Sequence, residues 1–209
     1  GEPDPTPAEK LLFTKQTQYP EIDLLIPQHN SEAFVLDETT DWWRGIQLVF
    51  TASDEDGEIM EYGYQVDDGE VFWTEDTSVY IPPTLLQEPL AGSHKLWVTA
   101  RDNTGLIDSL GDSTTLKLIR PNMTKGILVI DETQESVTPG SFQDAYPDSV
   151  VDEFYSDIFG TNNSWDYQQR GVPPRDTIGQ YRLIIWHADN NFTNNENVHK
   201  LPEHADLIR

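Results

Sequence analysis

Apolar and polar residues alternate with a period of two through the first half of the chain, from about Ile22 to Ile119. The clearest runs are IQLVFT (46–51), YGYQV (62–66), LWVTA (96–100) and LKL (116–118). Between them lie the turn-forming sequences DG (56–57 and 68–69), AGS (91–93) and NTG (103–105). Alternation of this kind is typical of strands with one buried face. It predicts an antiparallel, immunoglobulin-like β-sandwich of about seven short strands.

A different pattern begins at residue 126, where GILVIDE (126–132) forms a continuous apolar run that ends in two acids. Such a run is typical of a central strand of a parallel sheet, buried on both faces. A helix is predicted from about 147 to 159, because apolar residues recur there at helical spacing and Gly160 can end it. Further strands are predicted at 164–167 and 181–187, and the second of them is expected to be buried. The second half therefore predicts a three-layer α/β domain with a parallel sheet, incomplete at Arg209.

These patterns divide the chain into a tether (1–18), a sandwich (19–121) and the N-terminal part of an α/β domain (122–209). The first ten residues include three prolines and few apolar side chains. A mature protein often begins in this way after a signal peptide has been removed. We therefore expect a secreted or cell-surface bacterial protein. It could be a lipoprotein whose lipid anchor lies upstream of Gly1.

The chain is strongly acidic, with 13 Lys and Arg against 37 Asp and Glu and a formal net charge of −24. A field of this sign repels phosphate groups, so nucleic acids and anionic lipid surfaces are excluded as partners. Aromatic residues make up 11% of the chain, which is enough to build cores. There is no cysteine, hence no disulfide and no thiol nucleophile. No apolar run approaches the ~20 residues of a transmembrane helix.

Two segments of the first half, FTASDEDGEIMEYGYQVDDG (50–69) and LAGSHKLWVTARDNTGLID (90–108), carry a family resemblance. They resemble the fibronectin type III and PKD-like modules of bacterial surface and secreted proteins. The resemblance implies a sandwich that acts as a spacer, takes part in adhesion or supports a neighbouring domain. Without a disulfide, we expect four aromatic residues to hold the sheets together: Phe50, Tyr62, Tyr64 and Trp97.

The second half is similar to the class I glutamine-amidotransferase-like, flavodoxin-like superfamily, on the strength of GILVIDE (126–132) and QYRLIIWHADN (180–190). Enzymes of that superfamily carry a Cys or Ser nucleophile on a sharp turn after a later strand. The resemblance therefore implies a nucleophile beyond Arg209, and no catalytic residue can be transferred to this chain. The motifs of nucleotide-binding proteins, zinc proteases and esterases are absent.

Residues at the carboxyl ends of the predicted parallel strands are the candidate crevice. Ligands of open α/β sheets bind at this edge. Asp131, Glu132, His187 and Asp189 are expected there, where they could orient a substrate or bind a metal. The alternative is that these side chains only cap helices and keep the strand ends hydrated.

Two further clusters are candidate ligand sites in the sandwich. Trp42 and Trp43 are adjacent and cannot both point inward, so one of them could stack on a sugar or a peptide, or pack on the second domain. Acidic loop residues could bind calcium, or could serve only to stabilise turns. The calcium candidates are Asp54, Asp56, Asp102 and Asp108.

Two functions follow from these features. The first is a binding or interaction protein in which the sandwich supports the α/β domain, with an unidentified protein or glycan as partner. The alternative is a fragment of a larger hydrolase- or amidotransferase-like enzyme whose nucleophile lies beyond Arg209. No cofactor is expected apart from calcium.

Overall fold

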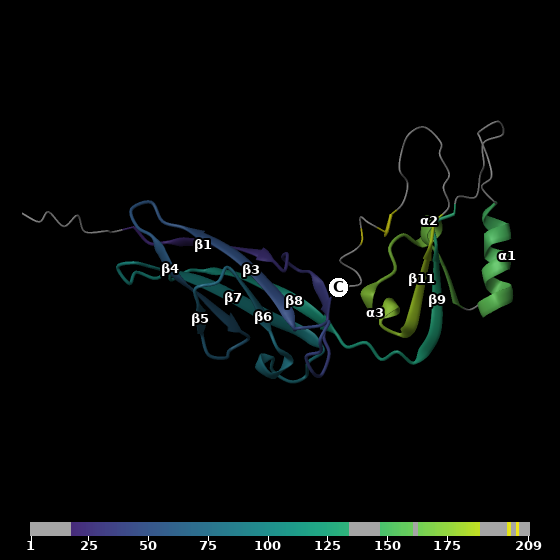
Figure 1. Cartoon of the computed structure of the whole chain (residues 1–209), viewed down its shortest axis with the longest axis horizontal. Coiled ribbons are helices and arrows are strands. Elements are labelled where there is room, and N and C mark those ends of the chain that lie inside the picture. The colour runs from purple at the N-terminus through teal and green to yellow at the C-terminus, as the bar shows by residue number, and fades with distance from the viewer. Residues whose placement is uncertain (1–17, 134–146, 161–162, 189–199, 202–203, 205–209) are drawn as a thin grey trace, which may run out of the picture.

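The computed structural model describes residues 18–133, 147–160, 163–188, 200–201 and 204. Two parts lie side by side, a β-sandwich and a small α/β part, with helix α3 (Arg175–Ile178) on the side of the α/β part nearest the sandwich (Figure 1). The predicted tether lies outside the described residues except for Gln18. No helix in the described part of the chain is long and apolar enough to cross a membrane.

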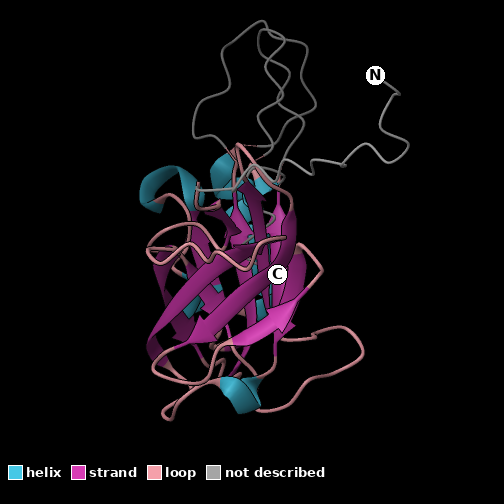
Figure 2. Cartoon of the chain, turned by 90° about the vertical axis from the view of Figure 1, so that its left-hand side faces the viewer, coloured by secondary structure: helices cyan, strands magenta, loops and turns pink. Residues whose placement is uncertain are grey.

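Eight strands and one short 3₁₀ helix form the sandwich. In chain order they are β1 (Glu21–Ile26), β2 (Glu32–Phe34), β3 (Ile46–Ser53), β4 (Ile59–Val66), β5 (Phe72–Thr74), β6 (Ser78–Ile81), η1 (Pro83–Leu85), β7 (Gly92–Asp102) and β8 (Asp112–Ile119). One sheet has the strand order β1-β3-β6 and the other β2-β8-β7-β4-β5. The strand pairs are antiparallel except for β2 and β8, which are parallel. This arrangement is an immunoglobulin-like sandwich, and Figure 2 shows its strands from one end of the molecule.

The core lies between the two sheets, where the inward residues of each strand meet. Leu48 and Phe50 of β3 face Leu96 and Val98 of β7, and all four side chains are at most 1% exposed. Phe50 also contacts Tyr62, with ring centroids 5.2 Å apart. The alternating pattern therefore predicted the inward residues of these long strands correctly.

The position of Trp97 differs from the prediction. It was expected to help hold the sheets together, but its neighbours Leu96 and Val98 point inward and its own side chain lies on the outer face of β7. There the indole Nε1 donates a hydrogen bond to Leu110 O at 3.0 Å. The ring lies over Gly111, where a Cβ atom would come within 2.5 Å of Nε1. Trp97 thus fixes a loop on the outside of the sandwich.

The second part is a three-stranded parallel sheet with the order β10-β9-β11. Its elements are β9 (Lys125–Asp131), α1 (Asp148–Phe159), β10 (Ser164–Asp166), α2 (Tyr167–Arg170), α3 and β11 (Tyr181–His187). The predicted strands, the helix and its end at Gly160, whose φ is +85°, agree with this structure. The sheet is parallel as expected, while the flavodoxin-like assignment stays a prediction.

Burial in this part differs from the prediction at two elements. The central strand β9 is buried on both faces, as expected, at Leu128, Val129 and Ile130. Strand β11 was expected to be equally buried, but it is at the edge of the described sheet and Leu183 is 51% exposed. Of the apolar stripe on α1, Val151 is buried, Tyr155 is half-buried, and Val150, Phe154 and Ile158 are exposed.

The two parts touch through α3 and the residues that follow it. Within the α/β part, the backbone N–H groups of Asn122 and Met123, in the segment that leads from β8 to β9, both donate to Gly179 O, at 2.9 and 3.1 Å. The guanidinium of Arg175 lies 5.4 Å from the ring centroid of Phe34 in β2. Arg175 is buried in this contact. The contact places α3 at one end of the sandwich, beside the groove described next.

Candidate functional site

A groove of about 710 Å³ opens at the end of the sandwich that faces α3. Its walls come from both sheets, because the chain leaves β1 at Ile26 and crosses to β2 in the other sheet. The polar and aromatic side chains exposed along it define what is called here the aromatic groove. They are Gln28, Trp42, Arg44, Gln47 and Tyr80.

The two adjacent tryptophans take opposite positions at this groove. Trp43 is 8% exposed and belongs to the sandwich core, whereas Trp42 is 76% exposed. The loop that holds them is tied by two hydrogen bonds between Thr40 and Trp43, from Trp43 N to Thr40 Oγ1 and from Thr40 N to Trp43 O. Gly45 ends the loop at φ +120°, where a Cβ atom would lie 2.1 Å from Ile81 O. The backbone therefore holds Trp42 outward.

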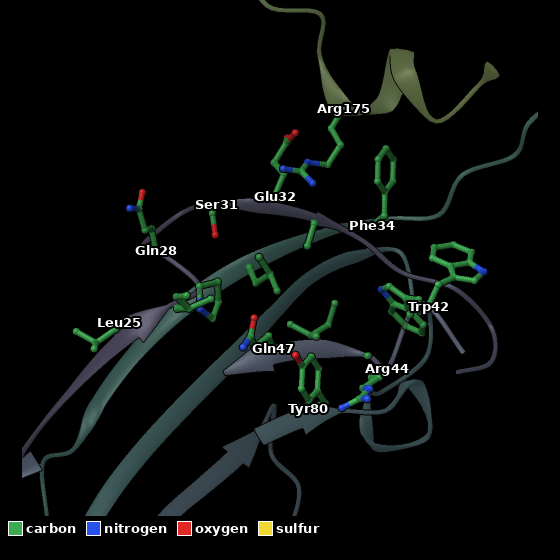
Figure 3. Close-up of a pocket in the computed structure, with 17 residues that line it drawn as sticks. Leu25, Gln28, Ser31, Glu32, Phe34, Trp42, Arg44, Gln47, Tyr80 and Arg175 are labelled. Atoms are coloured by element: carbon green, nitrogen blue, oxygen red, sulfur yellow. The ribbon is translucent and has the colours of Figure 1, made fainter. Parts of the chain in front are cut away.

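Tyr80 and Arg44 form the second feature of the groove. Tyr80 lies on β6 opposite Gln47 of β3 and is 43% exposed. The Arg44 guanidinium lies 5.8 Å from the Tyr80 ring centroid, within the range of a cation–π interaction. Figure 3 shows Trp42, Arg44, Tyr80 and Gln47 along the same groove. Aromatic surface and hydrogen-bonding groups thus lie side by side.

The opposite wall is formed by β2 and by the second part of the protein. Glu32 is held by Lys117, whose Nζ lies 2.7 Å from Glu32 Oε1. Arg175 reaches from α3 to a position between Glu32 and Phe34 (Figure 3). The α/β part therefore contributes directly to the wall of a groove that otherwise belongs to the sandwich.

The structure brings together two of the four predicted crevice residues. His187 pairs in register with Asp131 across β9 and β11, and His187 Nδ1 lies 3.0 Å from the hydroxyl of Tyr155. Glu132 is turned away and accepts hydrogen bonds from Trp186 Nε1 and from the backbone N–H of Lys200. Asp189 lies outside the described residues.

Two residues of α1 join Asp131 on this side of the sheet. One carboxylate oxygen from each of Asp131, Asp148 and Asp152 lies within 4.8 Å of the others. Burial, and then the negative charges of Asp131 and Asp166, raise the pKa of the Asp152 carboxyl. Burial and the charge of Asp131 likewise raise the pKa of the Tyr155 hydroxyl. Like charges are therefore concentrated at the carboxyl end of β9.

Three of the four acidic loop residues predicted as calcium ligands accept hydrogen bonds from backbone amides. Asp54 Oδ1 accepts from Asp56 N, and Asp108 Oδ1 accepts from Leu110 N and Gly111 N. Asp102 Oδ1 accepts from Thr104 N and Leu106 N. Burial would raise the pKa of Asp102, but its hydrogen bonds outweigh burial and lower it. These contacts are those of turn-stabilising carboxylates, and calcium binding at these loops stays a prediction.

Comparison with known proteins gives no family. No protein-family model matches the chain, and no curated protein is significantly similar to it in sequence. Among solved structures it is similar to the Clostridium thermocellum CbhA fibronectin(III)-like modules, with 23% identity over 51% of this chain and a TM-score of 0.39. It is also similar to the PKD1 domain of Vibrio anguillarum Epp, with 17% identity over 50% of this chain and a TM-score of 0.30. The matched regions cover 50% of the first of those chains and 100% of the second.

Sequence reasoning missed several members of both sites. No sequence pattern marked three residues of the aromatic groove, because they reach it only when distant strands and α3 come together. They are Tyr80, Gln47 and Arg175. Asp148 and Asp152 did carry a signal, since residues four apart share one face of a helix. Their proximity to Asp131 depends on how α1 packs against β9.

Proposed function

We propose that this chain is an extracytoplasmic binding protein whose aromatic groove takes a carbohydrate. The observation that carries the proposal is the 76% exposure of Trp42 on a loop that holds it outward, beside Tyr80 and Arg44. Apolar surface of this size gives a favourable free energy when a ligand covers it. The location outside the cytoplasm rests on the composition of the N-terminal residues.

The chemistry of the groove suits a sugar. The rings of Trp42 and Tyr80 offer apolar faces on which the C–H face of a pyranose can stack. Arg44, Gln47 and Gln28 supply donors and acceptors for hydroxyl groups. A volume of about 710 Å³ falls in the usual range of small-ligand sites.

A peptide is the second candidate ligand. Leu25 and Ile26 flank the groove and are 50% and 45% exposed, which gives apolar surface that a sugar would leave uncovered. An extended peptide could cover both residues as well as Trp42. The enzyme alternative stays a prediction.

The test is a glycan array probed with the full chain, followed by calorimetric titration of each sugar that binds. We expect Trp42→Ala to weaken binding about tenfold or more, equivalent to at least ~1.4 kcal/mol, because a central aromatic contact is lost. Tyr80→Ala is expected to act in the same direction.

Tyr19→Ala is the matched control. Tyr19 is 61% exposed but does not line the groove, so its removal should leave the affinity unchanged. Equal affinities for wild type and Trp42→Ala would refute the proposed site. If no sugar on the array binds but a peptide library yields peptides whose binding depends on Trp42, the ligand is a peptide and the sugar proposal is refuted.

A further inference from the structure

We propose that Asp131, Asp148 and Asp152 bind a divalent metal ion of the hard, oxygen-preferring kind, with Mg²⁺ as the expected ion. The site lies in the α/β part, at the carboxyl end of β9 and the first turns of α1. It is independent of the aromatic groove and of the ligand proposed there.

The geometry of Asp131 is the main support. It is the last residue of β9 and is only 3% exposed. Its Oδ1 accepts hydrogen bonds from the backbone N–H and the hydroxyl of Thr133, at 2.8 and 2.5 Å. Its Oδ2 is buried and has no hydrogen-bond partner among the residues that the structure describes. A buried carboxylate oxygen without a partner is costly, and a cation at this position would satisfy it.

The two helix residues complete a set of ligands. Asp148 and Asp152 are four residues apart, so they project from the same face of α1. Their carboxylates and that of Asp131 each offer one oxygen within 4.8 Å of the others. Three carboxylates this close repel one another, and a divalent cation between them removes the repulsion.

The choice of ion follows from the ligands. All three are carboxylate oxygens, which suit Mg²⁺, Mn²⁺ and Ca²⁺ better than softer metals. Mg²⁺ is usually held by one or two carboxylates and keeps several waters, whereas Ca²⁺ takes six to eight oxygen ligands, more than three side chains supply. The location also fits a ligand site, because the carboxyl ends of parallel strands are where open α/β sheets bind ligands.

The test is a titration of the full chain with Mn²⁺, followed by electron paramagnetic resonance of the free ion and by competition with Mg²⁺. We expect one saturable Mn²⁺ site that Mg²⁺ displaces. Asp152→Asn should weaken it about tenfold or more, because a charged ligand is removed. Asp152 is exposed, so this change should leave folding intact.

Asp157→Asn is the matched control. Asp157 lies exposed on the same helix, outside the carboxylate cluster, and its replacement removes the same charge from the acidic surface. It should leave the Mn²⁺ affinity within about twofold of wild type, as expected for weak surface electrostatics. The proposal is overturned by non-saturable binding, or by equal effects of Asp152→Asn and Asp157→Asn. It is also overturned by a saturable site that Asp152→Asn leaves unchanged, which would place the ion elsewhere.

Discussion

Asp67 connects three segments of the sandwich, and its replacement by Asn gives a sharp test of how the fold is held. Its carboxylate accepts hydrogen bonds from Lys95 N at 3.0 Å, from His94 Nδ1 at 2.9 Å and from Gln87 N at 3.3 Å. His94 is 4% exposed, and its Nε2 lies 3.2 Å from Leu90 O. Both ring nitrogens thus face hydrogen-bond acceptors, and the ring is held between Asp67 and Leu90.

Asp67→Asn removes the charge while keeping the shape. Asp67 has φ +52°, a conformation that Asn also tolerates, so the backbone is not strained by the change. Hydrogen bonds to a charged partner contribute about 1.5–3 kcal/mol, and the buried His94 loses such a partner. We therefore expect the free energy of unfolding to fall by about 2 kcal/mol at neutral pH.

The loss should depend on pH in a defined direction. Burial acts to raise the pKa of Asp67, but the hydrogen bonds from His94, Lys95 and Gln87 outweigh it and hold the pKa below its ordinary value of 3.8. A lowered pKa in the folded state means that the carboxylate stabilises the protein above its unfolded pKa. That stabilisation disappears as the pH falls through the folded pKa. Wild type and Asp67→Asn should therefore converge in stability as the pH falls below about 4.

The assay is urea unfolding of the full chain followed by tryptophan fluorescence and circular dichroism, at a series of pH values. Asp68→Asn is the control, because the neighbouring Asp68 is exposed and should change stability by less than about 0.5 kcal/mol. A difference between wild type and Asp67→Asn that stays constant from neutral to acid pH would refute the electrostatic argument. A difference no larger than that of Asp68→Asn would refute the role of Asp67 altogether.

Two further predictions concern packing, and the same unfolding assay tests them. Phe50→Ala should cost about 3–5 kcal/mol, because the ring is 1% exposed in the core, whereas Phe154→Ala, at a side chain 58% exposed on α1, should change stability by less than about 0.5 kcal/mol. Gly63→Ala should cost about 1–3 kcal/mol, because the added Cβ would lie 2.6 Å from Thr99 Cγ2 in the neighbouring strand. Gly126→Ala should be nearly neutral, because nothing lies within 4 Å of its Cβ position, and equal costs for the two glycines would contradict the packing argument.

The long strands were predictable because buried and exposed residues alternate along each of them. In β3 and β7 the inward residues alternate with outward ones, and the other named runs fall on β4 and β8. Strand β1 also alternates, but no run was named there. Strand β9 was found for the opposite reason, since both of its faces are covered. The strands β2 and β5 have three residues each, which is too short to show a period, and they exist because β8 and β4 pair with them.

The direction and exposure of individual side chains required the tertiary structure. The sequence indicated that Trp42 and Trp43 could not both be buried, but the Thr40–Trp43 hydrogen bonds and the tight turn at Gly45 decide which one faces the groove. Trp97 looked like a core residue by composition, yet its position in β7 places it outside. Similarly, the apolar residues of β11 suggest a central strand, and its place at the edge of the described sheet leaves Leu183 exposed.

The sequence by itself determined that the first half is a β-sandwich and that a parallel sheet follows it, along with the positions of the main strands and of α1. It also determined the acidic character of the chain. Only the tertiary structure decided the two sites, because each combines residues that are far apart in the chain. The aromatic groove joins Trp42, Tyr80 and Arg175 from both parts, and the carboxylate cluster joins Asp131 to Asp152. Periodicity reports which face of an element is apolar, whereas a site depends on which faces the packing of those elements brings together.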